Sequence, residues 1–578
     1  MTTVSATNLQ MPEERSLISR LAIRFSAQSR VEGLLFALVL VILLISVVLP
    51  LGMLALRSFQ SEELTAFTLA NYIEIVDNPR LLHGIVNSLL IAAGTTILSV
   101  FLGVALAWVN YRTNTPGTSI FSSLNLIPFF TPSFIGAIAW TLLASQNQGL
   151  LNKAVIALGA SGPIFNIYSP TGIIWVLSLF EAPLVYLFVS SAFRRMDPSL
   201  EEAARISGAG LFQTAATVTL PMALPSILAA ALLIFVTVLG SFEVPLVLGI
   251  PARFNVLTTE LYAMTSEYPV RYNMAAAMCV MLIVAAGLLL LIQRKLILSR
   301  DFITMTGKAY KPSRVDIGRG KYLGLAFNLV FVLSAVILPI FALLVTSLSP
   351  IWTGVIRPQT FTLANYLYVL TDFDVMRRGL KNTILLAIVG ATLGTILGTI
   401  SAYLVFRSKM PGRVFLDVLS GISLAVPGAI LAVGVAIFWL GTPVYGTLFI
   451  LLLAFVARFT PYAQRSVASS LIAVSGEFDE CSRVAGATWW GTVYNIVLPL
   501  IKPGVVAAWL LLFIMIVREL GMSLFLYKTG TETTSVAIYL LMIGRPSATA
   551  AACIIQVVIV LSIVMILRAT SRKDELML

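Results

Sequence analysis

Five ionisable side chains stand inside long apolar runs of this sequence. Charged groups are costly to bury in lipid, so such residues are candidates for lining a polar path or for pairing between helices. The five are Glu181, Glu243, Arg458, Arg518 and Glu519. If Glu181 faces Arg458, the two would form a structural clamp, whereas the adjacent Arg518 and Glu519 could line a polar cavity.

No catalytic or metal-binding chemistry is expected of the chain. Its one histidine, His83, stands alone before an apolar run, and its three cysteines lack the spacing of metal ligands: Cys279, Cys481 and Cys553. A phosphate-binding loop of the form Gly-x-x-x-x-Gly-Lys-Ser/Thr is absent, since Gly307-Lys308 and Gly320-Lys321 lack the earlier glycine and the following hydroxyl. The chain is therefore expected neither to be an enzyme nor to bind ATP, a metal or another cofactor itself.

A block of residues with one spacing occurs twice. The first copy reads Glu201-Glu-Ala-Ala-Arg-Ile-Ser-Gly208, nine further residues and Val218-Thr-Leu-Pro221. The second reads Asp479-Glu-Cys-Ser-Arg-Val-Ala-Gly486, nine further residues and Ile496-Val-Leu-Pro499. Two copies with the same spacing favour a shared role over routine helix-surface contacts.

The local signals predict the same shape for each copy of the block. Asp197-Pro198 and Ser475 are typical helix starts, and Gly208 and Gly486 are typical helix stops. Each copy is therefore expected to form a short helix, a break and a second short helix beside the membrane. The prolines of the two Leu-Pro pairs should then lead into the first turn of the next span.

The elements that position these residues must be membrane helices. The 578 residues are 58% hydrophobic and only 11% charged, which excludes soluble domains with polar surfaces. Since backbone amides in lipid must be bonded within their own segment, the apolar runs are helices, and the class is all-α polytopic. About twelve spans of roughly 20 residues are predicted, at 34–56, 87–109, 119–145, 172–193, 225–248, 274–292, 323–346, 382–406, 414–440, 446–463, 505–526 and 548–566.

The chain is internally duplicated. The hexapeptide Phe67-Thr-Leu-Ala-Asn-Tyr72 recurs unaltered as Phe361-Thr-Leu-Ala-Asn-Tyr366. The first copy carries about 17 extra residues, most simply placed in the loop 146–169. With six spans in each copy, the repeats are parallel and should be related by a pseudo-two-fold axis along the membrane normal. The expected organisation is an N-terminal segment 1–33, a first unit 34–293, a basic linker 294–322, a second unit 323–568 and a tail 569–578.

The net charge of +12 reflects topology and not a surface for nucleic acid. Most Lys and Arg residues fall in alternate loops, and the more basic set faces the cytoplasm in bacterial membranes. Both termini, the linker and the two blocks are therefore predicted to be cytoplasmic.

The duplicated block resembles the cytoplasmic signature of permeases from binding-protein-dependent, ATP-driven importers of the ABC type I class. That signature is Glu-Ala-Ala, three residues, Gly, nine residues, Ile, one residue, Leu-Pro. The first copy departs from it only at Val218, whereas the second has Cys481 and Ser482 in place of the alanines. The resemblance covers 67–294 and 361–568.

The resemblance implies two coupling helices, within 197–221 and 475–499, that dock on two copies of a cytoplasmic ABC ATPase. The coupling role would fall to Glu202, Ala203, Ala204, Arg205, Gly208, Leu220 and Pro221, and to Glu480, Arg483, Gly486, Leu498 and Pro499. ATP and Mg would be bound by the ATPase, and a periplasmic solute-binding protein would deliver the solute. The implied location is the bacterial inner membrane.

The solute is a further inference from resemblance. The fused two-unit layout and the segment Arg518-Glu-Leu-Gly521, with 527–533 after it, look like the ferric-iron branch of the family. Permeases for polyamines, thiamine or phosphonates are the alternatives. A different class, the ion-coupled secondary transporters, also has twelve spans in two parallel repeats, but it needs no coupling helices.

Overall fold

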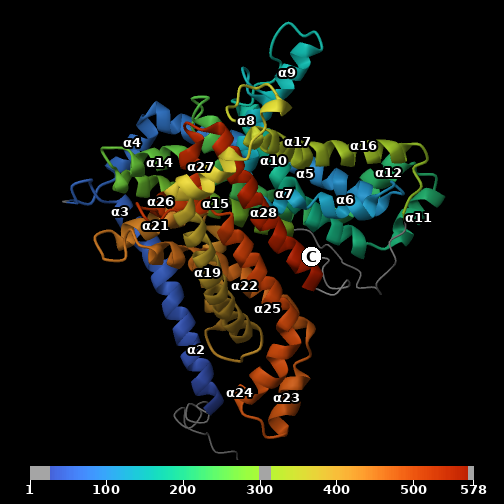
Figure 1. Cartoon of the computed structure of the whole chain (residues 1–578). Coiled ribbons are helices and arrows are strands. Elements are labelled where there is room, and N and C mark those ends of the chain that lie inside the picture. Colours follow the sequence, from blue (N-terminus) through green and yellow to red (C-terminus); the bar gives the residue numbers. More distant parts are fainter. Residues whose placement is uncertain (1–26, 65, 299–313, 571–578) are drawn as a thin grey trace, which may run out of the picture.

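A computed structural model describes residues 27–64, 66–298 and 314–570, and these residues fold into helices and their connections (Figure 1). The first unit contains α2 (Ala27–Leu43), α3 (Leu49–Ser58), α4 (Ala70–Asp77), α5 (Pro79–Arg112), α6 (Thr118–Leu124), α7 (Ile127–Phe130), α8 (Ser133–Ala144), α9 (Leu150–Ala157), α10 (Pro170–Arg195), α11 (Pro198–Ile206), α12 (Leu211–Thr214), α13 (Leu220–Leu239), α14 (Leu257–Ser266) and α15 (Tyr272–Leu298).

The second unit repeats this order with three differences. It contains α16 (Gly320–Val332), α17 (Leu338–Leu348), α18 (Ala364–Leu367), α19 (Asp374–Phe406), α20 (Arg413–Ala425), α21 (Gly428–Trp439), α22 (Leu448–Ala473), α23 (Glu477–Val484), α24 (Trp489–Thr492), α25 (Leu498–Val517), α26 (Gly521–Leu526), α27 (Thr534–Met542) and α28 (Pro546–Thr570). The differences are that α9 has no counterpart, α20 corresponds to α6 and α7 together, and α26 corresponds to a π-helical turn, Pro245–Gly249. The all-α polytopic class and the two parallel repeats are thereby confirmed.

Several predicted spans have different boundaries in the structure. Over the described residues, nine helices are long and apolar enough to cross a membrane. The third and ninth predicted spans are not straight, because the chain bends by 99° before α8 and by 106° before α21. Pro132 and Pro427 stand at these bends with extended backbone angles, which ends the preceding helix. The fifth and eleventh predicted spans are also displaced, since the helices run over Leu211–Leu239 and Trp489–Val517.

A π-helical turn lies inside four of the long helices, directly before a Leu-Pro pair. The turns are Leu44–Val48, Ala215–Thr219, Leu333–Ile337 and Val493–Val497. Proline has no N–H to continue the regular hydrogen-bond ladder, and the wider turn re-registers the helix so that it continues through the proline. The turns occupy matching places in the two units, which supports the pseudo-two-fold relationship.

The first helix of each unit packs against the other unit. α3 lies against α21 as well as α15, and α17 lies against α8 as well as α28. In Figure 1 α2 runs alongside α19, while α16 runs alongside α5 and α6. The two units are therefore interlocked, and they diverge as two wings from a common centre (Figure 1).

The repeated hexapeptide has a structural role. Asn71 donates to the carbonyl oxygens of Ser58 and Gln60, at 3.1 and 2.8 Å, and so caps the end of the first span. Asn365 makes the equivalent bonds to Ser347 and Ser349, at 2.9 and 2.8 Å. Because the amide satisfies carbonyls that a helix end leaves unpaired, the motif fixes the turn after the first span of each unit.

The extra residues of the first unit form a structured projection. α9 and its loop project from the molecule at the top of Figure 1, between α8 and α10. Asn152 holds this loop together, donating to the carbonyls of Ser145 and Phe165 and accepting from two backbone N–H groups. The corresponding connection of the second unit, 440–447, is much shorter, as the sequence comparison of the two halves predicts.

Candidate functional site: coupling helices and a central charged cluster

The first copy of the duplicated block begins with helix α11. The Asp197 carboxylate accepts from the Ser199 N–H at 2.9 Å, and Pro198 occupies the first helical position. The helix stops at Gly208, whose φ of +90° lies in the left-handed region, and Ala209 N–H bonds back to the Ala204 carbonyl at 3.0 Å. The predicted helix start and glycine stop are therefore confirmed.

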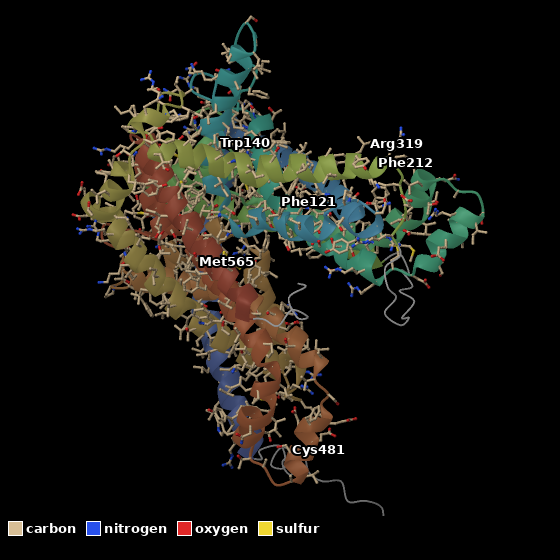
Figure 2. All side chains as sticks on the ribbon, turned by 45° about the vertical axis from the view of Figure 1, so that its right-hand side comes forward. Phe121, Trp140, Phe212, Arg319, Cys481 and Met565 are labelled. Carbon is tan, nitrogen blue, oxygen red and sulfur yellow. The ribbon has the colours of Figure 1, made fainter. Side chains whose placement is uncertain are left out.

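The second copy has the same geometry. The Ser475 hydroxyl accepts from the Glu477 N–H at 3.3 Å, at the start of α23. Gly486 has a φ of +85°, and Ala487 N–H bonds to the Ser482 carbonyl at 3.1 Å. α11 and α23 lie at the tips of the two wings (Figure 1), where Figure 2 labels Phe212, in α12 just after α11, and Cys481, in α23.

The predicted second short helix of each block is wrong. After the break, α12 and α24 are the first turns of the long helices that cross the membrane. The two Leu-Pro pairs are Leu220-Pro221 and Leu498-Pro499. Each pair lies within a continuous helix, directly after its π-turn, and not in the first turn of that helix. The π-turn accommodates the missing proline N–H, a feature that residue spacing alone does not reveal.

The exposed surfaces of the coupling helices combine charged and apolar side chains. Glu202, Ala203 and Arg205 are exposed and Ala204 is half-buried, and Glu480 is exposed on α23. The backbone of Arg483 lies in α23, but its side chain is outside the described residues. Sequence reasoning missed the apolar residues beside them. Ile206 is 88% exposed and its equivalent Val484 is 91% exposed, and Phe212 and Trp490 form a second exposed, equivalent pair.

The buried face of α11 carries an ion pair that the sequence analysis also missed. The Arg112 guanidinium lies 2.7 Å from Glu201 Oε1, and the two side chains are only 1% and 6% exposed. Thr219 Oγ1 donates to the same carboxylate oxygen at 2.5 Å. The first residue of the block is therefore its anchor, whereas Glu202 projects outward.

The five intramembrane charged residues come together where the two units meet. Glu181 lies close enough to Arg518 and Glu243 to interact electrostatically, and Glu519 interacts in the same way with Glu243, Arg458 and Arg518. All five side chains are half-buried. Residues from both units and from four different helices or helix ends thus form one polar cluster.

Glu243 links the two units directly. It lies in the break after α13, and its Oε1 accepts from the backbone N–H groups of Leu520 and Gly521 at 3.4 and 3.3 Å. Its Oε2 accepts from Ser133 at 3.0 Å, at the first residue of α8. The carboxylate of the first unit therefore caps α26 of the second unit.

The two arginines of the cluster are held by backbone carbonyls. Arg458 donates to the carbonyls of Ser423 and Val426, at 2.7 and 2.6 Å, at the end of α20. Its expected clamp with Glu181 is therefore wrong, because the bend before α21 leaves free carbonyls that attract the guanidinium. Arg518 donates to the Phe129 carbonyl. Since α25 ends at Val517, Arg518 and Glu519 lie in the break before α26 and not inside a helix.

Three aromatic rings join the units beside this cluster. Phe242 lies 5.2 Å from both Tyr262 and Phe525, and Tyr262 lies 5.5 Å from Phe525, measured between ring centroids. Phe242 and Tyr262 belong to the first unit and Phe525 to the second. Tyr262 lies on α14, and Phe242 directly precedes Glu243 in the chain, so the three rings lie beside the cluster.

The charged cluster is not a metal cage. Within the ranges that the structure describes, no group of three or more His, Cys, Asp or Glu side chains is arranged to hold a metal ion. The arrangement presents single carboxylates, whereas both guanidinium groups are bound to backbone carbonyls.

Comparison with known proteins identifies the family to which this sequence belongs. The family model of the binding-protein-dependent transport system inner membrane component matches residues 99–300 and 390–573. The ferric transport system permease protein FbpB of Actinobacillus pleuropneumoniae is 26% identical over 511 residues, which cover 87% of this chain and 72% of that protein. The putative ferric transport system permease protein FbpB 1 of Haemophilus influenzae is 27% identical over 78% of this chain and 71% of its own length.

A third relative aligns with less of the chain. The spermidine/putrescine transport system permease protein PotB of Escherichia coli is 28% identical over 227 residues, or 39% of this chain and 81% of that protein. The family model covers more than half of the chain and occurs once in each unit. The chain therefore belongs to the family of binding-protein-dependent transport system inner membrane components, as a multi-pass permease that carries the family domain twice.

Proposed function

We propose that this permease forms the solute pathway of an ATP-driven importer for ferric iron. Alternating access would carry the solute past the charged cluster, and α11 and α23 would each dock on one copy of a cytoplasmic ABC ATPase. ATP and Mg would be bound by that ATPase, and a periplasmic binding protein would deliver the solute. The permease would lie in the bacterial inner membrane, with both termini and both coupling helices on the cytoplasmic side.

The observation that carries the coupling role is the equivalence of the two exposed apolar pairs. Ile206 and Val484 occupy the same place in the block, each two residues before the glycine stop. Phe212 and Trp490 are likewise equivalent and exposed. Apolar side chains that stand out at structured helix ends are typical of protein interfaces. Two matching surfaces on one chain suit a partner with two matching subunits, such as an ATPase dimer.

Co-purification with the ATPase encoded beside this gene tests the coupling role. We expect Ile206→Glu with Val484→Glu to abolish co-purification, because each charge would have to be desolvated in an apolar socket. Leu158→Glu is the matched control, since Leu158 is 87% exposed on the projection away from the coupling helices. If the double variant retains the ATPase as wild type does, the proposed docking surface is wrong.

A second pair of variants probes the same surface by bulk. A Cβ atom added at Gly208 or Gly486 would meet no heavy atom within 4 Å, so Gly208→Arg with Gly486→Arg would project into the docking face. Both glycines have positive φ, so circular dichroism of the purified variant must first show an intact helical fold. Loss of the ATPase from the folded variant would support docking, and its retention would contradict docking.

The iron assignment rests on the relatives and on the cluster. The two FbpB proteins are ferric permeases that align with most of the chain. Three carboxylates against two arginines, both arginines bound to carbonyls, would suit a cationic solute. Because PotB is a spermidine/putrescine permease, polyamines are the second candidate, ahead of thiamine or phosphonates.

Binding-protein-dependent stimulation of ATP hydrolysis by ferric iron, and not by spermidine, would support the first assignment. The reverse result would replace it.

A further inference from the structure

A buried ion pair lies beneath the first coupling helix, and the equivalent charged residues of the second unit do not form one. Arg112 is the last residue of α5, and its Nε donates to Glu201 Oε1 at 3.1 Å while its terminal nitrogen lies 2.7 Å from the same oxygen. Thr219, in the π-turn of the following span, adds a third donor at 2.5 Å. Glu201 therefore ties α11 to two membrane helices at once.

The chain that enters the second unit is attached to the same point. Val315 N–H donates to the backbone carbonyl of Arg112 at 2.8 Å, and Val315 accepts from Asn114 N–H at 3.1 Å. The Asn114 side chain also binds Asp316 at 2.5 Å. Arg112 thus joins α5, the coupling helix and the segment that leads into α16.

The second unit has the same two charges at equivalent positions but does not pair them. Arg407, the equivalent of Arg112, donates to the carbonyls of Leu471 and Val474 at the end of α22. Asp479, the equivalent of Glu201, is buried, and its Oδ1 has no hydrogen-bond partner among the described residues. Val497 replaces Thr219, so the hydroxyl donor is missing as well.

The chemistry of the two anchors predicts different mechanical behaviour. Separating two opposite charges inside a protein is unfavourable, because each would be left buried without its partner. α11 must therefore move together with α5. By contrast, the corresponding bond of α23 is a neutral one, between the buried hydroxyls of Ser482 and Thr492 at 2.8 Å, and a neutral hydrogen bond costs less to break than a buried ion pair.

We propose that Arg112 and Glu201 are positioning residues that make the first coupling helix a stiffer link to the membrane helices than the second. The ion pair would transmit ATPase movement to α5, and the second link would tolerate more independent movement. This proposal rests on the proposed coupling to an ATPase.

The test compares Glu201→Gln with the matched control Asp479→Asn in the complete complex, reconstituted with its ATPase and binding protein. Solute transported per ATP hydrolysed is measured together with the amount of ATPase bound. We expect Glu201→Gln to keep the ATPase bound but to lower transport per ATP about fivefold or more, the usual size of coupling between sites. Asp479→Asn is expected to remain within about twofold of wild type. Equal effects of the two variants would overturn the proposal.

A cross-linking rescue separates positioning from folding. Arg112→Cys with Glu201→Cys removes the ion pair, and a short reducible thiol cross-linker restores a tie between α5 and α11. Cys279→Ala, Cys481→Ser and Cys553→Ala remove the three native cysteines, so that a small, membrane-permeant cross-linker can react only with the two introduced thiols. Transport per ATP should be low before cross-linking, recover with it and fall again on reduction.

Two results would contradict the positioning role. No recovery on cross-linking would show that the tie does not transmit movement, and failure of the variants to assemble with the ATPase would show that the pair serves folding alone. A wild-type permease that binds no ATPase would instead refute the proposed function, and not this inference.

Discussion

Replacing Gly103 by alanine should push two membrane helices apart. Gly103 lies on α5 at its crossing with α10, and a methyl group there would lie 2.5 Å from Val185 Cβ, 2.7 Å from the Ala182 carbonyl oxygen and 2.9 Å from the Tyr186 nitrogen. Two of these three atoms are backbone, so the side chain cannot relieve the clash by rotating. The crossing must widen.

The magnitude follows from two opposing effects. Overpacking of this kind costs about 1–3 kcal/mol, and backbone contacts place the cost near the upper end. Alanine recovers about 1 kcal/mol of helix propensity relative to glycine. The net destabilisation is about 2 kcal/mol, which for a chain of 578 residues corresponds to a fall in apparent Tm of about 1–2 °C.

Thermal unfolding of the purified protein in detergent measures this effect. Gly421→Ala is the matched control, because Gly421 lies within α20 and a methyl group there meets no heavy atom within 4 Å. The control should be as stable as wild type or slightly more stable. If Gly103→Ala and Gly421→Ala unfold at the same temperature, the close approach of α5 and α10 is wrong, and so is the position of Arg112 at the end of α5.

Three further outcomes follow from local contacts. Glu243→Ala should lower transport far more than Glu243→Gln, since the glutamine oxygen can still accept from the backbone N–H groups of the other unit and its NH2 can donate to the Ser133 hydroxyl, and uptake by the two variants checks this. Asn71→Ala should destabilise the protein by about 1–3 kcal/mol, seen as a lower Tm, because it leaves two carbonyls without their donor. The Arg271 guanidinium holds the pKa of Glu74 below its usual range, so their pair stabilises the fold above the unfolded pKa of about 4.3, and this contribution is lost as pH falls through the lower folded pKa. A solvent-exposed pair contributes less than about 1 kcal/mol to the free energy of unfolding, so at pH 7 wild type should have a slightly higher Tm than Glu74→Gln. An equal difference in Tm at pH 3 would contradict this.

The duplication made much of the fold predictable from the sequence. Two copies of one block at one spacing predicted two helices that start at Pro198 and near Glu477 and stop at Gly208 and Gly486, and the structure confirms them. Local signals were sufficient here, because caps and glycine stops act within a few residues.

Hydropathy could not predict the broken spans. The runs 119–145 and 414–440 are apolar throughout, and a mean over such a window is unaffected by a bend at Pro132 or Pro427. The long helices that begin at Leu211 and Trp489 were missed for a related reason, since the glycine and prolines near them suggested separate short helices. The π-turns that absorb the prolines depend on geometry along the whole helix.

Partners far apart in the chain were also beyond local reasoning. Arg112 and Glu201 are 89 residues apart, and their charges were visible in the sequence without a signal that they meet. One indirect signal was present: both units carry an arginine and an acidic residue at these equivalent positions, Arg407 and Asp479 in the second unit. The five intramembrane charges were named as separate candidates, and nothing in the sequence indicated that they come together. The pairing of Glu181 with Arg458 was wrong, because backbone carbonyls compete for the guanidinium.

Solute uptake by proteoliposomes tests the central claim most directly. The permease is reconstituted with its ATPase and binding protein, and uptake of ferric iron is followed with ATP present on the side of α11 and α23. The account predicts uptake that requires ATP hydrolysis and is lost with Ile206→Glu and Val484→Glu. Uptake by the permease alone, driven by a proton or sodium gradient without ATP, would contradict it and identify an ion-coupled transporter.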